Sequence, residues 1–360
     1  MINKNGVLHL QTELNKTCGV TRSILRIIKN SHNYEHHVIS LGGDALDRFE
    51  GYNYKIIHED RNSFIGTMKI FFTTLHYIKR NNIRIIHAHH RYFDLLSFLL
   101  KRFTPVKTVT TVHSKVYKKK LFSYKSDKVI VVSNAIKLHL MENFNINPSD
   151  IYLIHNFVDK NEIKIIQNKE EIFSEIGLTQ GAPLLGYFGR IDIKEKGVDV
   201  LLDALEMVAD KIPSIFLILA GNGVDEKILK EIALKKNLPV LFLGNLENIW
   251  NYLNACDIVI LPSRVEPFNI VMIEAGFLGK PVIGANVDGI AETLKDHRTG
   301  ILFSKENADD LKNKIIELLT DKNLMERIGH NLMDDIHNRF TIENIIPRIE
   351  EFYSRLLLQE

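Results

Sequence analysis

Cysteine is scarce in this chain, and no apolar segment is long enough to span a membrane. The two cysteines, Cys18 and Cys256, lie far apart and form no metal-spaced cluster, which favours a reducing compartment. No apolar run approaches the ~18–20 residues that a membrane-spanning helix requires. The first residues lead directly into an apparent strand and show no signal-peptide pattern. We therefore expect a cytoplasmic protein.

The sequence also lacks a dinucleotide-binding fingerprint, internal repeats and low-complexity tracts. The loop after the first expected strand contains Gly19 but no G-x-G-x-x-G pattern, so a nicotinamide-dependent oxidoreductase is poorly supported. With 360 residues, of which 45% are hydrophobic and 25% charged, the chain is long enough for two globular domains.

Charge is distributed unevenly along the chain, although the net charge is only +2. Residues 1–160 hold 24 Lys and Arg against 12 Asp and Glu, a net charge of +12, and the remainder carries −10. The densest basic stretch comprises Lys101, Arg102, Lys107, Lys115, Lys118–Lys120, Lys125 and Lys128. A basic half favours an anionic partner, such as a membrane surface, an anionic lipid or a nucleic acid. A well-solvated surface without such a partner explains the same pattern.

The first half of the chain alternates strand-like and helix-like segments, which is typical of a doubly wound α/β domain. The expected strands are Val7–Leu10, His37–Leu41, Arg84–His89, Lys107–His113, Lys128–Ser133 and Ile151–Asn156. Gly19 follows the first strand, where such sheets bind ligands. Two strands end in His89 and His113, so we expect histidines at one edge of the sheet and place His113 at the site. The other histidines in or beside these strands are assigned structural roles: His36, His37, His87 and His90.

The segment Phe64–Arg80 has the periodicity of an amphipathic helix. Its apolar side comprises Phe71, Phe72, Leu75 and Ile78. We assign this side to the protein core in preference to a membrane surface.

The second half repeats the alternation of strands and helices. Arg190 and Lys196 flank one strand-to-helix turn, where a guanidinium and an ammonium can neutralise a pyrophosphate. A later strand ends in Gly221-Asn222-Gly223, a turn that lets a ligand approach the backbone. Three helices are expected near the end of the chain, at Ala308–Thr320, Leu324–Phe340 and Ile342–Leu358.

A second candidate anion site follows the expected strand Asp257–Leu261. A helix should begin near Phe268, with Pro267 in its first turn, where the missing N–H costs nothing. The amides of Asn269, Ile270 and Val271 would then point out of the helix start, where the macrodipole favours an anion.

Two carboxylates bracket this helix start, Glu266 in the preceding turn and Glu274 within the helix. Carboxylates are unsuited to holding a phosphate, but they accept hydrogen bonds from hydroxyls. We therefore expect Glu266 and Glu274 to bind a sugar or a ribose.

With these features the chain resembles the retaining GT-B glycosyltransferases of family 4. Residues 180–305 carry the strongest motifs: Phe188-Gly189-Arg190, Lys196-Gly197, Leu219–Gly223, Leu243-Gly244, Asp257–Ser263, the E-x7-E pair Glu266 and Glu274, Gly279–Ile283 and Gly289-Ile290. Looser matches in the first half are Gly19, His87-Ala88-His89, Val112-His113, Val132-Ser133 and His155–Asp159.

The resemblance implies an α/β fold of the GT-B type, with two Rossmann-like domains facing across a cleft. Residues 1–165 would form an N-terminal acceptor-binding domain and residues 166–340 a nucleotide-sugar-binding domain. Residues 341–360 would form a helix that packs back on the first domain.

The resemblance also implies roles for individual residues. The catalytic set would be Arg190, Lys196, Glu266 and His113, with the two cations on the donor diphosphate and His113 beside the sugar. The donor-binding set would be Gly19, Gly221, Asn222, Asn269, Ile270, Val271 and Glu274. No metal site and no cofactor are expected, since members of this fold use cationic side chains and a helix dipole in place of a divalent metal.

The implied reaction moves a hexose or N-acetylhexosamine, with retention of anomeric configuration, from a UDP-linked nucleotide diphosphate sugar to an acceptor hydroxyl. The acceptor would be a saccharide or lipid-linked saccharide in bacterial surface polysaccharide synthesis. In the family's front-face route the leaving phosphate helps to deprotonate that hydroxyl. The basic half would then meet an anionic membrane at its inner face, and no nucleic acid.

Four positions depart from the family pattern, because a larger residue stands where glycine is common. These are Cys18, Phe157, Asn269 and Asp288. Two alternatives to glycosyl transfer remain: a nucleotide-sugar epimerase or hydrolase of the same fold, and a non-catalytic subunit that binds a partner. The intact Glu266 and Glu274 pair, together with Arg190 and Lys196, argues against the non-catalytic subunit.

Overall fold

The computed structural model describes residues 4–117 and 122–358 and divides the chain into two compact units. The first unit comprises residues 1–156 together with 342–360, and the second comprises residues 157–341. The first change of unit thus precedes the boundary expected at residue 165. At the two crossings the chain is tied together, since the Val158 amide donates to the Phe340 carbonyl oxygen at 2.8 Å.

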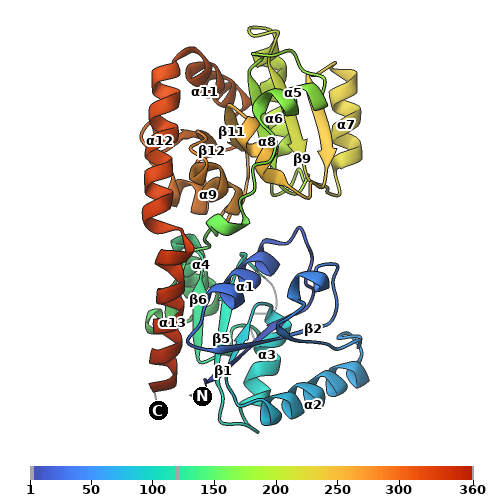
Figure 1. The fold of residues 1–360 in the computed structure, drawn as a ribbon, viewed down its shortest axis with the longest axis vertical. Coiled ribbons are helices and arrows are strands. Elements are labelled where there is room, and N and C mark those ends of the chain that lie inside the picture. The colour runs from blue at the N-terminus through green and yellow to red at the C-terminus, as the bar shows by residue number, and fades with distance from the viewer. Residues whose placement is uncertain (1–3, 118–121, 359–360) are drawn as a thin grey trace. The chain divides into compact units, whose positions relative to one another are not determined.

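The first unit is built on a seven-stranded parallel sheet with the order β3-β2-β1-β4-β5-β6-β7 (Figure 1). Its strands are β1 (Gly6–Gln11), β2 (Glu35–Ser40), β3 (Asn53–Ile56), β4 (Ile83–Ala88), β5 (Lys107–Val112), β6 (Lys128–Val131) and β7 (Ile151–Leu153). The order reverses between β1 and β4, and this is where open α/β sheets bind ligands, beyond the carboxyl ends of the strands.

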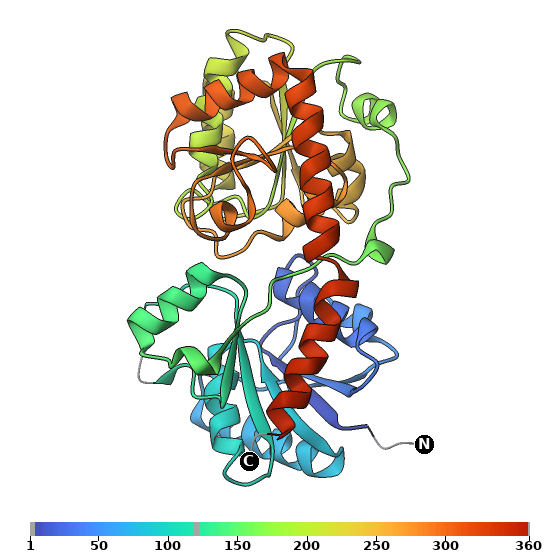
Figure 2. The same cartoon turned by 90° about the vertical axis from the view of Figure 1, so that its left-hand side faces the viewer.

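Helices cover both faces of this sheet. They are α1 (Gly19–Asn30), α2 (Phe64–Arg80), α3 (Arg91–Leu100), α4 (Asn134–Phe144) and α13 (Ile342–Leu358). The helix α13 packs against α1 and β4, so the end of the chain completes a unit that begins with its first strand (Figure 2).

The second unit contains a six-stranded parallel sheet with the order β10-β9-β8-β11-β12-β13. Its strands are β8 (Leu184–Phe188), β9 (Phe216–Ala220), β10 (Val240–Gly244), β11 (Ile258–Leu261), β12 (Val282–Ala285) and β13 (Ile301–Phe303). Its helices are α5 (Lys169–Glu175), α6 (Val198–Ala209), α7 (Glu226–Lys235), α8 (Ile249–Ala255), α9 (Ile270–Phe277), α10 (Asp288–Thr293), α11 (Ala308–Thr320) and α12 (Lys322–Arg339).

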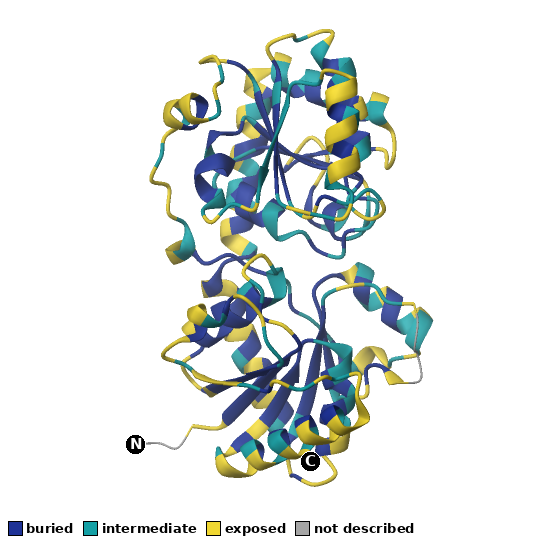
Figure 3. Ribbon diagram, turned by 90° about the vertical axis from the view of Figure 1, so that its right-hand side faces the viewer, coloured by how far each residue is buried: buried dark blue, intermediate teal, exposed yellow. Residues whose placement is uncertain are grey.

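The central strands of both sheets are buried along their length, whereas the helices show one buried and one exposed side (Figure 3). In the second unit the largest core joins β8, β9 and β11 to the apolar sides of α6 and α11. Strands covered on both faces lose the alternation of polar and apolar residues. This explains why the sequence shows them as continuous apolar runs.

The assignment of the α2 apolar side to the core was wrong for one residue. Ile78 is buried, and Phe71 and Leu75 pack against the core of the first unit. Phe72, however, is 57% exposed, because the helix turns it away from the sheet. It belongs to the outward side of α2.

Several elements are absent from the sequence-based expectation. One is the helix α10, Asp288–Thr293, where the sequence analysis assigned no helix. Short elements that carry too few residues for a periodic signal were also missed: β3, β13, α3, α5, α7 and α8. Of the basic stretch, Lys118–Lys120 lie outside the described residues. No helix in the described parts of the chain has the length and apolar character needed to cross a membrane.

Candidate functional site

The loop between β8 and α6 brings Arg190 and Lys196 to the carboxyl edge of the second sheet. Gly197 ends this loop at φ +62°, and a Cβ there would lie 2.3 Å from the Pro262 carbonyl oxygen. Glycine is therefore needed where the loop passes the end of β11. Arg190 is 51% exposed and forms an ion pair with Glu195.

Lys196 and Glu266, predicted separately to bind a diphosphate and a sugar, are in direct contact. The Lys196 Nζ lies 2.6 Å from the Glu266 Oε2. The same oxygen accepts hydrogen bonds from Asn269 Nδ2 at 2.8 Å and Ser263 Oγ at 3.2 Å. The Glu266 side chain is only 6% exposed. Three donors thus converge on one buried carboxylate oxygen and fix its position.

The helix α9 begins two residues later than predicted. Asn269 is its N-cap, and the Asn269 Oδ1 accepts a hydrogen bond from the Met272 amide at 2.9 Å. Pro267 precedes the helix and is not in its first turn, because the Asn269 side chain starts the helix in place of a proline. The amides predicted to bind an anion were those of Asn269, Ile270 and Val271. Those of Ile270 and Val271 belong to the first turn of α9.

Glu274 lies in the second turn of α9 and is fully buried. The turn that precedes α9 is held by close packing: the Gly289 amide donates to the Glu266 carbonyl oxygen at 3.0 Å. A Cβ on Gly289 would come within 2.1 Å of the Pro267 carbonyl oxygen. Its neighbour Asp288 has φ +39°, a strained conformation for a residue with a side chain. Glycine would adopt this conformation without that strain.

Arg264 is a central residue of this region that the sequence interpretation missed. Its guanidinium forms a two-bond contact with Asp199, at 2.7 and 2.8 Å, and a third bond with Glu306 at 2.7 Å. The Arg264 amide also donates to the Glu195 carbonyl oxygen at 2.8 Å. These bonds tie the loop that carries Lys196 to the turn that carries Glu266. The visible signal was an arginine in the polar turn after an apolar strand.

The turn after β9 supports the loop after β8. The Ile191 amide donates to the Asn222 carbonyl oxygen at 3.0 Å. A Cβ on Gly221, which has φ +132°, would lie 2.0 Å from the Gly189 carbonyl oxygen. A Cβ on Gly223 would likewise lie 1.8 Å from the Ile191 carbonyl oxygen. These glycines bring two loops into contact, which positions Arg190.

In the first unit, the prediction that two strand ends deliver histidines to one edge is confirmed. The rings of His89 and His113 stack with centroids 5.8 Å apart. Burial lowers the pKa of His113 to about 4, so the imidazole is neutral at neutral pH. Gly19 is the first residue of α1, after the loop that follows β1. His90 caps α3, since its Nδ1 accepts a hydrogen bond from the Tyr92 amide at 3.1 Å.

Two family models match this chain. The model described as Glycosyltransferase Family 4 matches residues 17–162, and the model described as Glycosyl transferases group 1 matches residues 168–333. The first match lies in the N-terminal half and the second falls within the second unit. Together they take in most of the chain.

Similar proteins extend over nearly the whole chain. An uncharacterized glycosyltransferase of Methanocaldococcus jannaschii is 27% identical, with 94% of this chain and 95% of the relative aligned. The UDP-Gal:alpha-D-GlcNAc-diphosphoundecaprenol alpha-1,3-galactosyltransferase of Escherichia coli is 24% identical over 83% of this chain and 82% of the relative.

Among solved structures, Anabaena HepE in complex with UDP-glucose superposes with a TM-score of 0.86 at 20% identity. The superposition covers 97% of this chain and 99% of the HepE chain. This likeness shows the fold, and the family matches show the lineage. The chain belongs to the family 4, group 1 glycosyltransferases and has their GT-B fold.

Proposed function

We propose that this protein is a retaining glycosyltransferase that transfers a hexose or N-acetylhexosamine from a UDP-linked donor to a saccharide or lipid-linked saccharide. Its product would belong to a bacterial surface polysaccharide. The observation that carries the proposal is the contact between Lys196 and Glu266 at the strand ends of the second unit. The Escherichia coli relative supports a UDP donor and a lipid-linked acceptor by its name, and the HepE complex supports UDP-glucose as a ligand of the fold.

The proposed diphosphate site consists of two cations and a helix start. Arg190 and Lys196 would bind the two phosphates and stabilise charge on the leaving nucleotide. The amides of Ile270 and Val271 would add the partial positive charge of the α9 start. Lys196 forms an ion pair with Glu266, so a bound diphosphate would share the Lys196 ammonium with that carboxylate.

The proposed sugar and ribose contacts use the two glutamates. Glu266 would accept hydrogen bonds from hydroxyls of the donor sugar, and Glu274 from the ribose. Asn269 anchors Glu266 from the helix cap, and Gly221 and Asn222 shape the neighbouring turn. In the first unit, His113 would lie beside the sugar, and Gly19 would let the loop after β1 approach the diphosphate or the acceptor.

Retention would follow a front-face route. The proposed diphosphate contacts are amides and cationic side chains, which can neutralise the leaving group without a divalent cation. We therefore expect donor binding and transfer to be insensitive to a chelator.

The acceptor would be reached at the inner face of the plasma membrane. The outward side of α2 carries four exposed apolar residues, Phe64, Ile65, Met68 and Phe72. They recur at a helical spacing on one side, beside the exposed cations Lys69, Lys79 and Arg80. An apolar strip flanked by basic residues is the pattern of a helix that lies in the interface of an anionic membrane. The basic character of the N-terminal half supports the same partner.

The donor can be identified by thermal unfolding with UDP-glucose, UDP-galactose, UDP-N-acetylglucosamine and GDP-mannose, each with and without EDTA. A ligand at 100 times its Kd stabilises the folded state by about 2.7 kcal/mol. We expect a UDP-sugar to raise the melting temperature of the wild type equally in both conditions, and to have a much smaller effect on Glu274→Gln. No shift with any UDP-sugar, or a shift that EDTA abolishes, would contradict the proposed donor site.

A further inference from the structure

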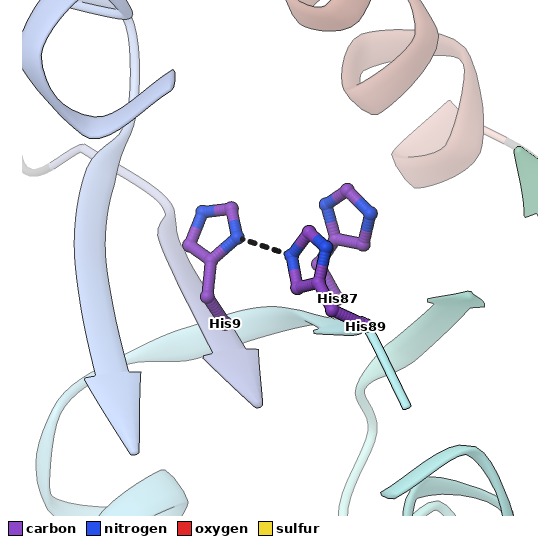
Figure 4. Close-up of side chains that lie close together, drawn as sticks. All are labelled: His9, His87 and His89. Atoms are coloured by element: carbon purple, nitrogen blue, oxygen red, sulfur yellow. Dashed lines mark hydrogen bonds between the residues drawn. The ribbon is translucent and has the colours of Figure 1, made fainter. Parts of the chain in front are cut away.

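Four buried histidines and one partly buried histidine gather on one face of the first sheet. They are His9 on β1, His36 on β2, His87 on β4, and His89 and His113 just beyond β4 and β5 (Figure 4 shows three of them). Side chains alternate along a strand, so these residues share the face opposite Leu8, Leu10 and Ile86. The same face receives Tyr353 of α13, whose hydroxyl lies 2.7 Å from the His87 Nδ1.

Three of these histidines form a continuous hydrogen-bonded chain. The His89 Nε2 lies 3.1 Å from the His9 Nδ1, and the His9 Nε2 lies 2.9 Å from the His36 Nδ1. The His36 Nε2 lies 2.9 Å from the Ser31 Oγ, which donates to the Glu350 Oε1 at 2.8 Å. The chain therefore runs from a strand end to a half-exposed carboxylate on α13.

Each imidazole in this chain carries one proton at neutral pH. Burial lowers the pKa of His36 to about 4 and the pKa values of His9 and His89 well below their usual range. A neutral imidazole has one N–H donor and one bare acceptor nitrogen. Each ring must therefore donate on one side and accept on the other.

Glu350 fixes the donor-to-acceptor direction of every hydrogen bond in this hydrogen-bonded chain. Its carboxylate accepts from Ser31 and from the amide and side-chain nitrogens of Asn33, at 3.1 and 2.6 Å. The Ser31 hydroxyl donates its only proton to Glu350, so the Ser31 oxygen must accept a hydrogen bond from the His36 Nε2–H. By the same count His36 accepts from the His9 Nε2–H, and His9 accepts from the His89 Nε2–H.

With these proton positions, the His89 Nδ1 carries no proton and can only accept a hydrogen bond. That atom is buried and has no hydrogen-bond partner among the described residues, and the same holds for the His113 Nε2 beside it. Unsatisfied buried polar atoms are rare and call for an explanation, such as a catalytic role or an ion. The hydrogen-bonded chain thus begins at the His89 Nδ1, an acceptor without a donor, at the sheet edge where His113 lies.

A metal ion explains the cluster less well. Nitrogen atoms of His9, His87 and His89 lie within 4.8 Å of one another, close enough to share an ion. However, both nitrogens of His87 are engaged, with Tyr353 at 2.7 Å and Thr111 at 2.6 Å. Both nitrogens of His9 are engaged in the chain. An ion would therefore have to break hydrogen bonds that are already formed.

We propose that His89, His9, His36, Ser31 and Glu350 form a proton relay that leads from the strand-end edge to solvent. A proton binds the His89 Nδ1 as His89 passes its Nε2 proton to the His9 Nδ1. In the same way His9 passes a proton to the His36 Nδ1, His36 to the Ser31 oxygen, and Ser31 to Glu350. Each bond formed to hydrogen is matched by one broken, and Glu350 releases the proton to water. Ring and hydroxyl rotation restores the starting state.

The use of this relay rests on the proposed glycosyl transfer. Each transfer breaks the bond from the sugar to the diphosphate, forms the bond to the acceptor oxygen, and releases the proton of the acceptor hydroxyl. The leaving phosphate would take that proton first and pass it to the His89 Nδ1, directly or through a water. His89 would be the receiving end, and the other members would position and discharge it.

The relay can be tested without any substrate by nitrogen-15 NMR of the histidine side chains in the full chain. We expect His9, His36 and His89 to be protonated on Nε2. Glu350→Gln and Ser31→Ala should slow deuterium exchange of the His9 and His36 ring protons by about tenfold, the scale of one lost hydrogen bond. Tyr353→Phe is the matched control: it removes a hydroxyl from the same cluster but not from the relay, and exchange should be unchanged.

The direction of the effect separates a relay from a structural role, since loosened packing speeds exchange and a broken path slows it. Unchanged or faster exchange in Glu350→Gln, or a proton on the His89 Nδ1, would overturn the relay. The role of the relay in transfer is tested with the UDP-sugar that gives the thermal shift and with water as acceptor. Glu350→Gln should then lower kcat about tenfold at constant KM, the scale of one lost hydrogen bond. An unchanged kcat would overturn that role. Absence of any nucleotide-sugar turnover in the wild type, with the exchange result intact, would instead contradict glycosyl transfer.

Discussion

At the scale of single residues, the donors on Glu266 govern the proposed donor site. A lysine from the loop after β8, and a serine and an asparagine from the turn before α9, converge on one oxygen of this carboxylate. A buried carboxylate is costly unless it is paired and hydrogen-bonded. Lys196 therefore has two tasks, as the counter-charge of Glu266 and as the proposed cation for the diphosphate.

Replacing Lys196 by alanine should lower kcat/KM for sugar transfer by about 10²–10³-fold, the usual effect of losing one group that stabilises developing charge. Release of UDP from the UDP-sugar that gives the thermal shift measures this rate. Lys194→Ala is the control, because Lys194 is an exposed lysine of the same loop. A Lys196→Ala enzyme with the wild-type rate would remove this lysine from the proposed catalytic set.

At the scale of elements, α2 shows how one helix serves two environments. Its inner side places Ile70 and Ile78 in the core of the first unit. Its outer side exposes Phe64 and Phe72 by 79% and 57%. Such large exposed apolar side chains along one helix indicate an interaction surface, and the neighbouring lysines and arginine favour an anionic one.

The double variant Ile65→Ser, Phe72→Ser should bind vesicles of anionic phospholipid more weakly than the wild type. Burying one such side chain contributes about 1.5–3 kcal/mol, so the loss should be at least about tenfold. Co-sedimentation at low salt measures it. Leu234→Ser is the control, since Leu234 is an apolar residue on α7 of the second unit that is 81% exposed. Equal binding by the double variant and the wild type would exclude α2 as the membrane contact.

The bounds of α2, α11 and α13 could be predicted to the residue, because their apolar periodicity is long and regular. The side on which Phe72 falls could not, since Phe71 and Phe72 are equally apolar and only packing against the sheet distinguishes them. Short elements such as α10 carry too few residues for a period.

The residues of the proposed site could be named from the sequence, but their contacts could not. The motif around Arg190, Lys196, Glu266 and Glu274 names the residues. The contact between Lys196 and Glu266, however, joins positions 70 apart in the chain. Ser31 and Glu350 are separated by 319 positions, and no local pattern links them. Such pairs are set by the strand order.

At the scale of the whole molecule, the first unit depends on several buried neutral histidines. Burial lowers the pKa of His36 and His113 to about 4 and that of His87 to about 3. In the unfolded chain these groups titrate near 6.5. Between these values the unfolded state binds more protons than the folded state, so the folded state loses stability as the pH falls.

We therefore expect the first unit to lose stability between about pH 6.5 and pH 4, by about 1.4 kcal/mol per pH unit for each buried imidazole. Amide hydrogen exchange in β1 and β4, corrected for intrinsic rates, should accelerate from pH 7 to pH 5. Amides of β8 and β9 in the second unit serve as the internal reference. Equal pH dependence in both sheets would show that the histidines do not govern the acid stability of the first unit.

The helix α13 has a consequence for the order in which the protein matures on the ribosome. The first unit begins with β1, yet Tyr353 and Glu350, which close its histidine face, follow the second unit in the sequence and are made after it. The nascent first sheet must therefore wait, with that face uncovered, while all of the second unit is synthesised and can fold. A nascent chain stalled before Ile342 would carry a folded second unit and an unfinished first one, a target for chaperones.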